Sequence, residues 1–442
     1  MEHVIDLEHQ AARIAEGADL CVQCGLCLSV CPTYALTGEE IQSPRGRVML
    51  YRAAAVGELM DDQTVLKAAY DCLDCQACQT ICPSGVKPGE LALETRAALQ
   101  GGQTHSPPLR AMLEAFKHPW AMDLVNAALL GYQRSGLQGW VRGSGLLRGL
   151  ASHYGGRWAD LQTMESLLPQ RPIAPAMRLR RPRWTPHRGA YRGTVAFFLG
   201  CVMNAVFSEA SAASCELLAR NGYDVVLLPE TSCCGAPHIE EGDDRGYRQL
   251  AAKTARLYGD LAVDAIVTDC AACGAELKKL GRYFADDPEL ATPLARVSAL
   301  ARGISEFLRW AGIRETGATG PGRPTTYQDA CHLCHAQGIC KQPRELLQDN
   351  PQVAYVELEG ADACCGSAGI YNLSHRETSQ ELLKGKVERV RRSGAEVLAA
   401  ENPGCLLQLE AGCREAGLAV EVRHTSLILL DAYLEGEAPG GA

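Results

Sequence analysis

The sequence lacks any hydrophobic run long enough to cross a membrane. Its longest apolar stretch, residues 121–132, is interrupted by Asp123 and falls well short of the roughly 20 apolar residues that a spanning helix needs. The first residues, MEHVIDLEHQAARIAEG, contain neither the basic segment nor the apolar segment of a secretory signal. We therefore expect a cytoplasmic protein, and peripheral attachment to the inner face of the cell membrane stays open.

A positive charge excess and a dinucleotide-binding motif are also lacking. The 442 residues include 43 Lys and Arg against 52 Asp and Glu, a net charge of -9, so no global basic field would attract a nucleic acid. No G-x-G-x-x-G motif follows an expected strand, and we expect no dinucleotide site in this chain. Hydrophobic residues at 47% and charged residues at 21% are ordinary for a globular protein, and the length predicts about two to four domains.

Cysteine is the residue that the sequence has in excess. In a reducing compartment 21 cysteines do not form a disulfide framework, so we interpret them as metal ligands. Two copies of C-x-x-C-x-x-C-x-x-x-C-P lie near the N-terminus. They comprise Cys21, Cys24, Cys27 and Cys31-Pro32 in the first copy, and Cys72, Cys75, Cys78 and Cys82-Pro83 in the second.

This run is typical of ferredoxins with two [4Fe-4S] clusters, in which the fourth cysteine of each copy ligates the cluster of the other copy. Two such clusters side by side indicate a one-electron carrier. Zinc also binds C-x-x-C pairs, but zinc ribbons use separated pairs and need neither the third cysteine nor the following proline. One cluster is thus predicted at Cys21, Cys24, Cys27 and Cys82, and the other at Cys72, Cys75, Cys78 and Cys31.

The segments around and after the second copy predict helices and a linker. The sequence SPRGR at residues 43–47 predicts a helix start with serine as the N-cap, although its arginines could instead screen clusters or meet a partner. Residues 91–100, 109–116 and 121–132 are helix-like. Residues 171–192 hold seven arginines and no acid. We expect a solvated linker there, and contact of this basic strip beside Trp184 with an anionic membrane or an acidic partner is the alternative.

From about residue 193 onward the chain repeats itself. Each repeated cysteine group follows a short apolar run, TVAFFLG, AVDAIVTD, TTYQDA or AEVLAAENPG, with helix-like residues 209–221 and 376–390 between them. Two small α/β units with parallel strands are therefore predicted, with cysteines at the carboxyl ends of strands, where open α/β sheets bind ligands. Cys201, Cys233-Cys234-Gly235 and Cys270 recur as Cys331, Cys364-Cys365-Gly366 and Cys405, at offsets of 130, 131 and 135 residues.

The repeated cysteines form two candidate ligand sets. A lone Cys-Cys-Gly would be three small residues at a turn, but its recurrence indicates a ligand motif, with glycine where the backbone turns sharply and comes close to the metal. In the second copy Leu406-Leu407-Gln408 stands where a closing C-x-x-C would need cysteine, and His332, Cys334 or His335 could substitute. Cys215, Cys340 and Cys413 fit no pattern and are interpreted as ordinary thiols. The first set is Cys201, Cys233, Cys234, Cys270 and Cys273, and the second is Cys331, Cys364, Cys365 and Cys405.

The chain resembles the iron-sulfur subunit of glycolate oxidase. The resemblance rests on CVQCGLCLSVCPTY, SPRGR, CLDCQACQTICPSGV, CCGSAGIYNLSH and NPGCLLQL, and on the order of two cluster runs, linker and two repeats. More broadly, the chain is similar to proteins that join a two-cluster ferredoxin to two Cys-Cys-Gly domains. These include the anaerobic glycerol-3-phosphate dehydrogenase C subunit, lactate-utilisation iron-sulfur proteins and heterodisulfide reductase subunits.

The resemblance implies the electron-transfer subunit of a glycolate (2-hydroxy-acid) oxidase complex, an oxidoreductase. A partner subunit with FAD would take the hydride, and this chain would pass single electrons toward a quinone or another acceptor. No catalytic residue for substrate oxidation is expected in it. In heterodisulfide reductases a similar five-cysteine motif binds a non-cubane cluster that acts on disulfides. A third cluster is therefore implied at the first set, and whether the second set binds one is open.

Three alternatives stand beside this reading. They are a heterodisulfide-reductase-like catalytic subunit using clusters on Cys-Cys-Gly, the iron-sulfur subunit of a lactate or glycerol-3-phosphate dehydrogenase, and a zinc-stapled interaction protein. The predicted fold class is α+β or α/β. We expect a mostly helical two-cluster ferredoxin domain at residues 1–100, a helical region and Pro/Arg-rich linker at 101–192, and two duplicated small α/β cysteine-rich domains at 193–322 and 323–442.

Overall fold

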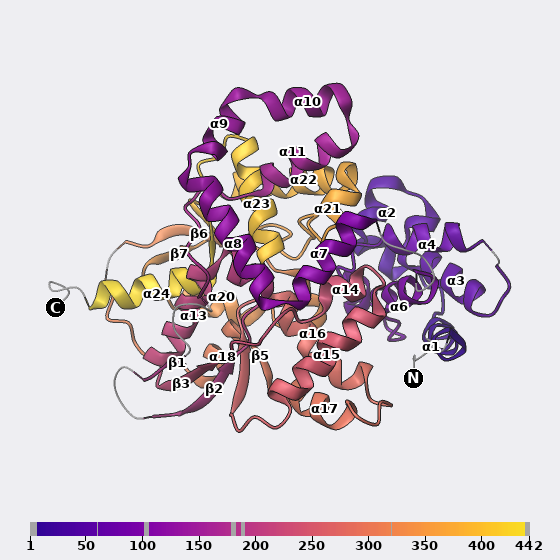
Figure 1. Ribbon diagram of the computed structural model, residues 1–442, viewed down its shortest axis with the longest axis horizontal. Coiled ribbons are helices and arrows are strands. Elements are labelled where there is room, and N and C mark those ends of the chain that lie inside the picture. Colours follow the sequence, from indigo (N-terminus) through magenta and orange to yellow (C-terminus); the bar gives the residue numbers. More distant parts are fainter. Residues whose placement is uncertain are drawn as a thin grey trace.

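The N-terminal part of the chain is helical, as predicted, and its cysteine runs occupy the connections between helices. The computed structural model describes residues 7–59, 61–100, 106–177, 183–186, 191–319 and 321–437. The helices of this part lie together at the right of the molecule in Figure 1, and buried Val48, Tyr51, Val65 and Ala69 form a small core among them. Its elements are α1 (Leu7–Asp19), η1 (Leu26–Val30), α2 (Pro32–Thr37), η2 (Glu40–Gln42), α3 (Pro44–Ala55), α4 (Asp62–Tyr70), α5 (Ala77–Thr80) and α6 (Pro88–Gln100).

The SPRGR segment starts a helix, as its sequence predicts. The Ser43 hydroxyl accepts a hydrogen bond from the Gly46 amide at 3.0 Å, and Pro44 occupies the first turn of α3. This cap satisfies one of the amides that a helix N-terminus leaves without an intrahelical partner. The cap thereby fixes where α3 begins in the segment between the two cysteine runs.

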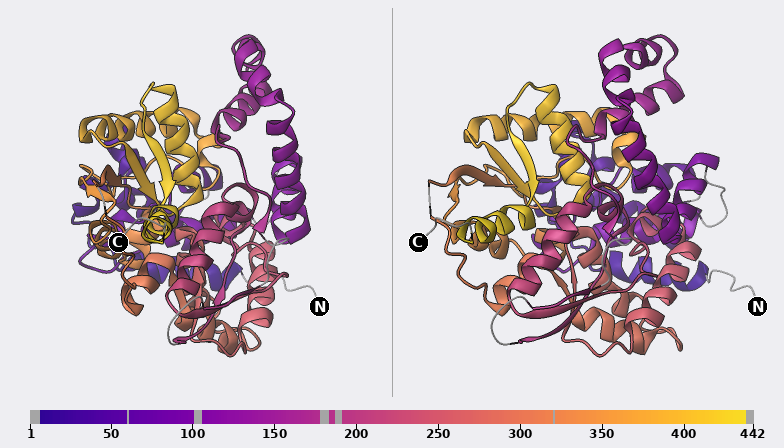
Figure 2. Two further views of the ribbon diagram at one scale, coloured as in Figure 1. Left: turned by 90° about the vertical axis from the view of Figure 1, so that its left-hand side faces the viewer. Right: turned by 60° about the vertical axis from the view of Figure 1, so that its left-hand side comes forward.

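The helix-like stretches after residue 100 form an arm that projects from the body of the molecule (Figure 2). Left-handed glycines at residues 136, 145 and 155 stand just before successive short helices and let the chain turn there. Among the residues that the structure describes, no helix is long and apolar enough to cross a bilayer. The elements are α7 (Pro107–Lys117), α8 (Pro119–Arg134), α9 (Leu137–Ser144), α10 (Leu146–Tyr154) and α11 (Gly156–Leu167), and α8–α11 are called the arm.

The Pro/Arg-rich tract is not a solvated linker where the structure describes it, so that prediction is wrong. Arg171 pairs with Glu209, and Arg183 pairs with Asp224. Trp184 is only 5% exposed and belongs to a hydrophobic core, so it does not face a membrane or a partner. The tract binds its own chain because two of its arginines pair with carboxylates and its apolar residues pack into a hydrophobic core. The arginines at 178, 180, 181 and 188 lie outside the described residues.

The first repeat is an open α/β sheet with strand order β1-β3-β2-β4-β5. All neighbouring strands run parallel except β1, which pairs antiparallel with β3. Fully buried Val195, Phe197, Ile266 and Val267 lie on the central strands. The elements are β1 (Arg183–Trp184), β2 (Gly193–Phe197), α12 (Cys201–Val206), α13 (Ser208–Arg220), β3 (Tyr223–Leu227), α14 (Ala236–Glu240), α15 (Asp244–Tyr258), β4 (Ala265–Thr268), α16 (Ala271–Tyr283), α17 (Ala291–Leu300), β5 (Ala301–Gly303) and α18 (Ile304–Ala311).

The second repeat has the same topology, so the predicted duplication extends to the order of the strands. Its sheet is fully parallel with order β7-β6-β8-β9, which matches β3-β2-β4-β5 of the first. In both sheets the order reverses beside the first strand of the repeat, which is where such sheets bind ligands at their carboxyl edge. The elements are β6 (Arg323–Tyr327), α19 (Cys331–Gln337), α20 (Lys341–Gln348), β7 (Val353–Tyr355), α21 (Tyr371–Ser374), α22 (Arg376–Ser393), β8 (Val397–Ala400), α23 (Pro403–Glu415), β9 (Glu421–His424) and α24 (Thr425–Gly436).

One buried arginine joins the N-terminal helices to the first repeat. Arg96 of α6 is 5% exposed, and its guanidinium donates to the carbonyls of Ala69 and Cys72 at 2.8 and 2.6 Å and to that of Glu240 at 2.7 Å. These bonds fix the second cysteine run against the end of α14.

We predict that Arg96→Met lowers the free energy of unfolding by about 2 kcal/mol or more, because buried carbonyls lose their charged donor. Guanidinium denaturation measures the change. Arg110→Met is the matched control, since the Arg110 side chain is exposed on α7 and its loss should change stability by less than about 0.5 kcal/mol. Equal effects of the two substitutions would contradict the assignment.

Candidate metal centres

The eight cysteines of the N-terminal runs line two small cavities. Cys21, Cys24, Cys27 and Cys82, together with Cys78, line one cavity of about 30 Å³. The other, of about 20 Å³, is lined by Cys31, Cys72, Cys75 and Cys78. The fourth cysteine of each run thus lies with the first three of the other run, which is the arrangement expected of two-cluster ferredoxins.

The backbone of both runs turns in the same way around these cavities. Gln23 and Gly25 of the first run have φ values of 55° and 82°, and Asp74 and Gln76 at the matching positions of the second run have 44° and 61°. Three of these four are not glycine, and left-handed backbone costs such residues free energy. Strain at matched positions indicates that the thiols, rather than local preference, dictate the loop.

A buried cation lies beside the second cavity. Arg47 is 3% exposed, and its guanidinium donates to the Ala68 carbonyl at 2.9 Å and to the Thr33 hydroxyl at 3.0 Å. Burial lowers the pKa of Arg47, but the negative charge of Cys72 and Cys31 outweighs this effect and raises it. Of the two uses considered for the arginines of SPRGR, Arg47 therefore serves to offset charge at the thiols, and it is too buried to meet a partner.

The first Cys-Cys-Gly set gathers at the carboxyl edge of the first sheet. Cys201 begins α12 after β2, Cys233 and Cys234 follow β3, and Cys270 caps α16 after β4. Hydrogen bonds link the thiols in the order Cys201, Cys233, Cys234, Cys273 and Cys270, and those to Cys201 and Cys234 raise the pKa of Cys233. The structure brings all five predicted thiols together.

The second set forms a shorter chain in the same order. Its thiols are linked from Cys331 through Cys364 and Cys365 to Cys405. The Lys386 ammonium, on a side chain only 1% exposed, donates to the Gly360 carbonyl at 2.7 Å. Burial lowers the pKa of Lys386, whereas the charges of Cys365 and Cys331 favour its protonated form. Sequence reasoning missed this lysine because it lies within the helix-like stretch and carries no motif.

The register of the sheets corrects how the two sets were matched. Ala265 pairs with Val195 in the first sheet, and Val397 pairs with Thr325 at the same position of the second sheet. Equivalent residues of the third strands, β4 and β8, are therefore 132 residues apart. Cys405 therefore matches Cys273, not Cys270 as the offset of 135 suggested. Asn402 takes the place of Cys270, because each caps the helix that follows the strand. The second set lacks the first cysteine of C-x-x-C, not the last, and comparing TDCAAC with AENPGC would have shown it.

None of the three residues considered as substitutes is free to complete the second set of thiols, although His332 lines the same cavity as that set. The His332 ring contacts the Asp74 carbonyl at 2.9 Å, and Asp74 raises the pKa of His332 to about 9 against the effect of burial. The His335 ring contacts the Asp362 carbonyl at 3.0 Å on the surface. Cys334 and Cys340 form a disulfide, so Cys340 is not an ordinary thiol. Cys215 and Cys413 are buried thiols in α13 and α23.

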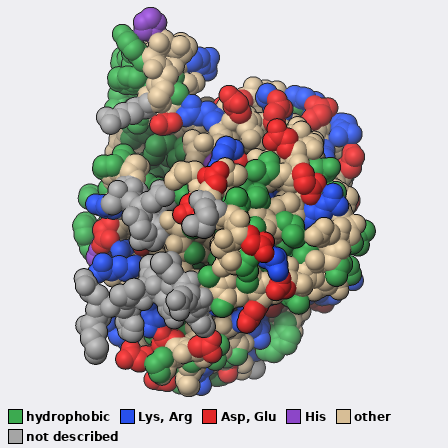
Figure 3. All heavy atoms as spheres, turned by 90° about the vertical axis from the view of Figure 1, so that its right-hand side faces the viewer, with side chains coloured by type: hydrophobic (Ala, Val, Ile, Leu, Met, Phe, Trp, Pro, Cys, Tyr) green, Lys and Arg blue, Asp and Glu red, His purple; other side chains and the backbone are tan. Residues whose placement is uncertain are grey.

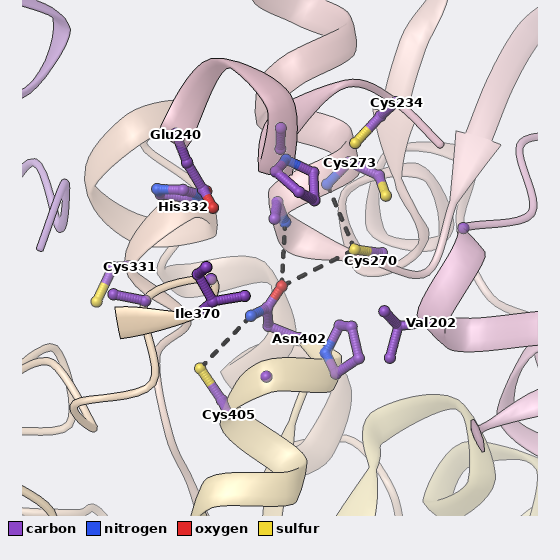
Figure 4. A pocket seen from close by; sticks show the side chains of 18 of the residues that line it. Val202, Cys234, Glu240, Cys270, Cys273, Cys331, His332, Ile370, Asn402 and Cys405 are labelled. Atoms are coloured by element: carbon purple, nitrogen blue, oxygen red, sulfur yellow. Dashed lines mark hydrogen bonds between the residues drawn. The ribbon is translucent and has the colours of Figure 1, made fainter. Parts of the chain in front are cut away.

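Both sets open onto one cavity of about 240 Å³ between the repeats. Asn402 stands between them: its carboxamide oxygen accepts from the Ala272 amide at 3.3 Å and from the Cys270 thiol at 3.8 Å, and its nitrogen donates to the Cys405 thiol at 3.8 Å (Figure 4). Cys75 of the N-terminal part also lines this cavity. Burial raises the pKa of Cys75 well above its usual range, and Cys331 adds to the rise. The thiol sites therefore form one contiguous series.

The residues present fit iron-sulfur clusters in their chemistry. Burial raises the pKa of the Cys78 thiol well above its usual range, and the charges of Cys72 and Cys31 add to the rise, so a bound cationic metal would favour the thiolate. Among the residues that the structure describes, no three Cys, His, Asp or Glu side chains are gathered as ligands of a single metal ion. The thiols lie instead around cavities and in chains.

The glycine of each Cys-Cys-Gly motif is required by the turn. Gly235 and Gly366 have φ values of 101° and 87°, and their amides donate to the thiols of Cys233 and Cys364, each at 3.4 Å. A Cβ on Gly366 would lie 2.6 Å from the Ser379 carbonyl oxygen. The sharp turn was predicted from the sequence and is confirmed. The close approach was expected to be toward a metal, and the structure shows it toward protein atoms.

We predict that Gly366→Ala lowers the free energy of unfolding by about 2 kcal/mol, because it combines left-handed backbone with a steric clash. Gly385→Ala is the matched control, since Gly385 lies within α22 with open space around its Cβ position and should gain about 0.5–1 kcal/mol. Denaturation of both variants measures this. Stabilisation by alanine at both positions would contradict the strained turn.

Comparison with protein families identifies each part of the chain. Residues 17–86 match the 4Fe-4S dicluster domain, residues 195–278 and 325–410 match the cysteine-rich domain, and residues 109–168 match the linker region of the glycolate oxidase iron-sulfur subunit. The repeats and the N-terminal runs thus fall in families that are defined by their cysteines.

Whole-length relatives agree with these matches. The chain is 38% identical over 430 residues to the probable glycolate oxidase iron-sulfur subunit of Bacillus subtilis, covering 95% of each chain. It is 27% identical over 428 residues to the glycolate oxidase iron-sulfur subunit of Escherichia coli, covering 94% of this chain and 95% of the relative. Lactate utilization protein A of Oceanobacillus iheyensis is 30% identical over 55% of this chain and 98% of its own. The chain is an iron-sulfur electron-transfer protein and belongs to the glycolate oxidase iron-sulfur subunit family.

Proposed function

We propose that this chain receives electrons from a partner subunit that holds FAD and oxidises glycolate, and passes them to a quinone or another acceptor. The observation that carries the proposal is the contiguous series of thiol sites, from the two cavities of the N-terminal part to the sets of both repeats. Bound iron-sulfur clusters would accept and release single electrons there. In this proposal the chain works from the inner face of the cell membrane, and none of its described helices is long and apolar enough to span it.

The residues proposed to hold the clusters follow the thiol neighbourhoods. Four units are proposed to divide the work: residues 1–100 with the two [4Fe-4S] sites, 101–192 as a helical region whose Pro/Arg-rich end packs on the first repeat, and the cysteine-rich domains at 193–322 and 323–442. The five thiols of the first set and the four of the second are proposed as further ligands. The [4Fe-4S] ligands are Cys21, Cys24, Cys27 and Cys82 for one cluster and Cys72, Cys75, Cys78 and Cys31 for the other.

The surface around Cys24 is suited to an electron-transfer partner. Cys24 is exposed at the edge of the first cavity. Leu20, Val22 and Leu26 around it are 51%, 68% and 50% exposed. Apolar side chains beside an exposed redox site allow a partner to exclude water and approach closely. We propose this edge as the docking place of the FAD subunit.

A second candidate function is supported by the shared cavity. Two thiol sets face one cavity of about 240 Å³ whose lining includes apolar Phe116, together with Val202 and Ile370 (Figure 4). A disulfide substrate bound in this cavity would lie between the two thiol sets, as a disulfide reductase requires. Disulfide reduction is therefore the alternative to glycolate oxidation that an assay must separate.

The decisive assay is anaerobic purification of this chain from its native cells, followed by dye reduction with glycolate, D-lactate and glycerol 3-phosphate separately. We expect a co-eluting flavoprotein and activity with glycolate. Activity with one of the other two substrates would assign a related dehydrogenase. A preparation without flavoprotein and without activity on any of the three would favour disulfide reduction.

Iron content tests the cysteine-rich domains. We predict clearly more than about eight irons per chain, since two cubanes account for eight and the first set of thiols should add a further cluster. Serine at both Cys233 and Cys234 should remove only that excess. Iron and acid-labile sulfide are measured on anaerobic protein, and a content of about eight in the unaltered chain would contradict the third cluster.

Val22→Glu tests the docking edge. We predict that this variant co-purifies with less flavoprotein and loses most glycolate-dependent dye reduction, because a charge would be buried at the contact. Leu434→Glu is the matched control, since Leu434 is 50% exposed on α24. The visible spectrum of the clusters should be the same in both. Full activity of Val22→Glu would place the FAD subunit elsewhere.

A further inference from the structure

The arm exposes large apolar side chains along its outer helices. Trp140 and Tyr154 are 60% and 66% exposed, and Leu137, Leu146, Trp158 and Leu161 are between 41% and 53% exposed. Figure 3 shows hydrophobic side chains over the projecting upper part of the molecule. We call these six residues the apolar tip. These side chains of α9–α11 face water instead of the body of the molecule, and an exposed apolar patch of this kind marks an interaction site.

The apolar residues of the tip follow helical spacing. Leu146 and Tyr154 lie eight residues apart on α10, and Leu137 and Trp140 lie three apart on α9, so each pair shares a face of its helix. Trp158 and Leu161 repeat the pattern on α11. The three helices are short and are joined at glycines, so their exposed apolar side chains gather on one projecting segment.

The charge of the same segment is of one sign. From residue 124 to residue 159 the sequence has four arginines and no Asp or Glu. Arg134 and Arg148 are exposed, and among the residues that the structure describes neither forms an ion pair. Arg142 pairs with Glu165, and Asp160 pairs with Arg376 of α22 at 2.6 Å. Both acids of α9–α11 are thus paired with arginines, and the unpaired charges on the described residues of this segment are positive.

We propose that the apolar tip of the arm binds the surface of an anionic lipid bilayer. Tryptophan and tyrosine prefer the boundary between headgroups and hydrocarbon, leucine enters the hydrocarbon, and exposed arginines attract anionic headgroups. Because the chain has a net charge of -9, an anionic bilayer would repel most of the protein surface. A protruding segment whose two acids, Asp160 and Glu165, are both paired with arginines reduces this repulsion, because it reaches the bilayer ahead of the acidic body.

The geometry of the arm supports this occupant over a protein partner. Figure 2 shows the tip on the arm that projects from the body, whereas Cys24 lies between α1 and η1 of the N-terminal part, so the tip can be buried without covering the edge around Cys24. This inference deepens the proposed function by naming the surface that holds the chain at the membrane. It assigns the membrane contact to α9–α11, away from the Pro/Arg-rich tract.

Vesicle sedimentation tests the proposal. The full chain, with its clusters reconstituted, is pelleted with vesicles of phosphatidylcholine alone or with phosphatidylglycerol added. We expect binding to the anionic vesicles, weaker by about 30-fold for Arg134→Glu with Arg148→Glu and by about tenfold for Trp140→Ser. Higher salt should weaken the binding as well.

Matched controls isolate the tip. Arg245→Glu with Arg256→Glu places the same charges on exposed positions of α15, and Trp310→Ser removes a tryptophan that is 75% exposed on α18. Both controls should bind vesicles as the unaltered chain does.

Two results would overturn the proposal. One is vesicle binding that is absent in the unaltered chain or unchanged in the tip variants. The other is loss of the co-purifying flavoprotein in the tip variants without loss of vesicle binding, which would make the tip a protein contact. Glycolate-dependent dye reduction is measured in parallel, so failure of the membrane contact is distinguished from failure of the proposed electron transfer.

Discussion

The repulsion between crowded thiolates is the constraint on which the rest of the structure depends. Sulfurs that must converge cannot all be ionised in apolar surroundings unless positive charge lies close by. The chain places Arg47 beside the N-terminal thiols and Lys386 beside the second Cys-Cys-Gly set, and both are buried. Iron supplies the remaining positive charge when clusters are bound. The strained turns at Asp74 and Gln76 and the left-handed Gly235 and Gly366 are consequences of bringing those sulfurs together.

The two duplicated repeats have the same strand topology but different residues at their thiol sites. Their strand orders match, and the amide of each motif glycine donates to the first thiol of its Cys-Cys pair. At the helix cap after the third strand, the first repeat has Cys270 and the second has Asn402. With asparagine at this position the second set has one thiol fewer than the first. The Asn402 carboxamide instead forms hydrogen bonds to thiols of both sets across the cavity. Asn402 therefore joins the two halves through hydrogen bonds to a thiol of each set.

Much of this architecture could be predicted from the sequence, because its signals are local. The spacing within the N-terminal runs, the cap at Ser43 and the apolar runs before each cysteine group depend on short stretches of chain. The ligand swap between Cys31 and Cys82 was predicted from the pattern of ferredoxins, and the cavities are consistent with it.

What sequence reasoning missed depends on contacts between distant residues. The role of Lys386 follows from packing of α22 against the second set of thiols, and that of Asn402 follows from the register of two sheets. The Pro/Arg-rich tract was misjudged because Glu209 and Asp224, which bind its arginines, lie well beyond it in the chain. The exposed face of the arm was not predicted, since a helix-like pattern does not tell which helices remain unpacked.

The central claim is that this chain is a one-electron carrier with two neighbouring [4Fe-4S] clusters in its N-terminal part. The most direct test is the EPR spectrum of the anaerobically reduced chain at low temperature. The account predicts about two spins per chain from the N-terminal part, with the broadened signals of two clusters that interact magnetically, and loss of this interaction when Cys82 is replaced by serine. A single isolated signal, or none, in protein that contains its full iron would contradict it.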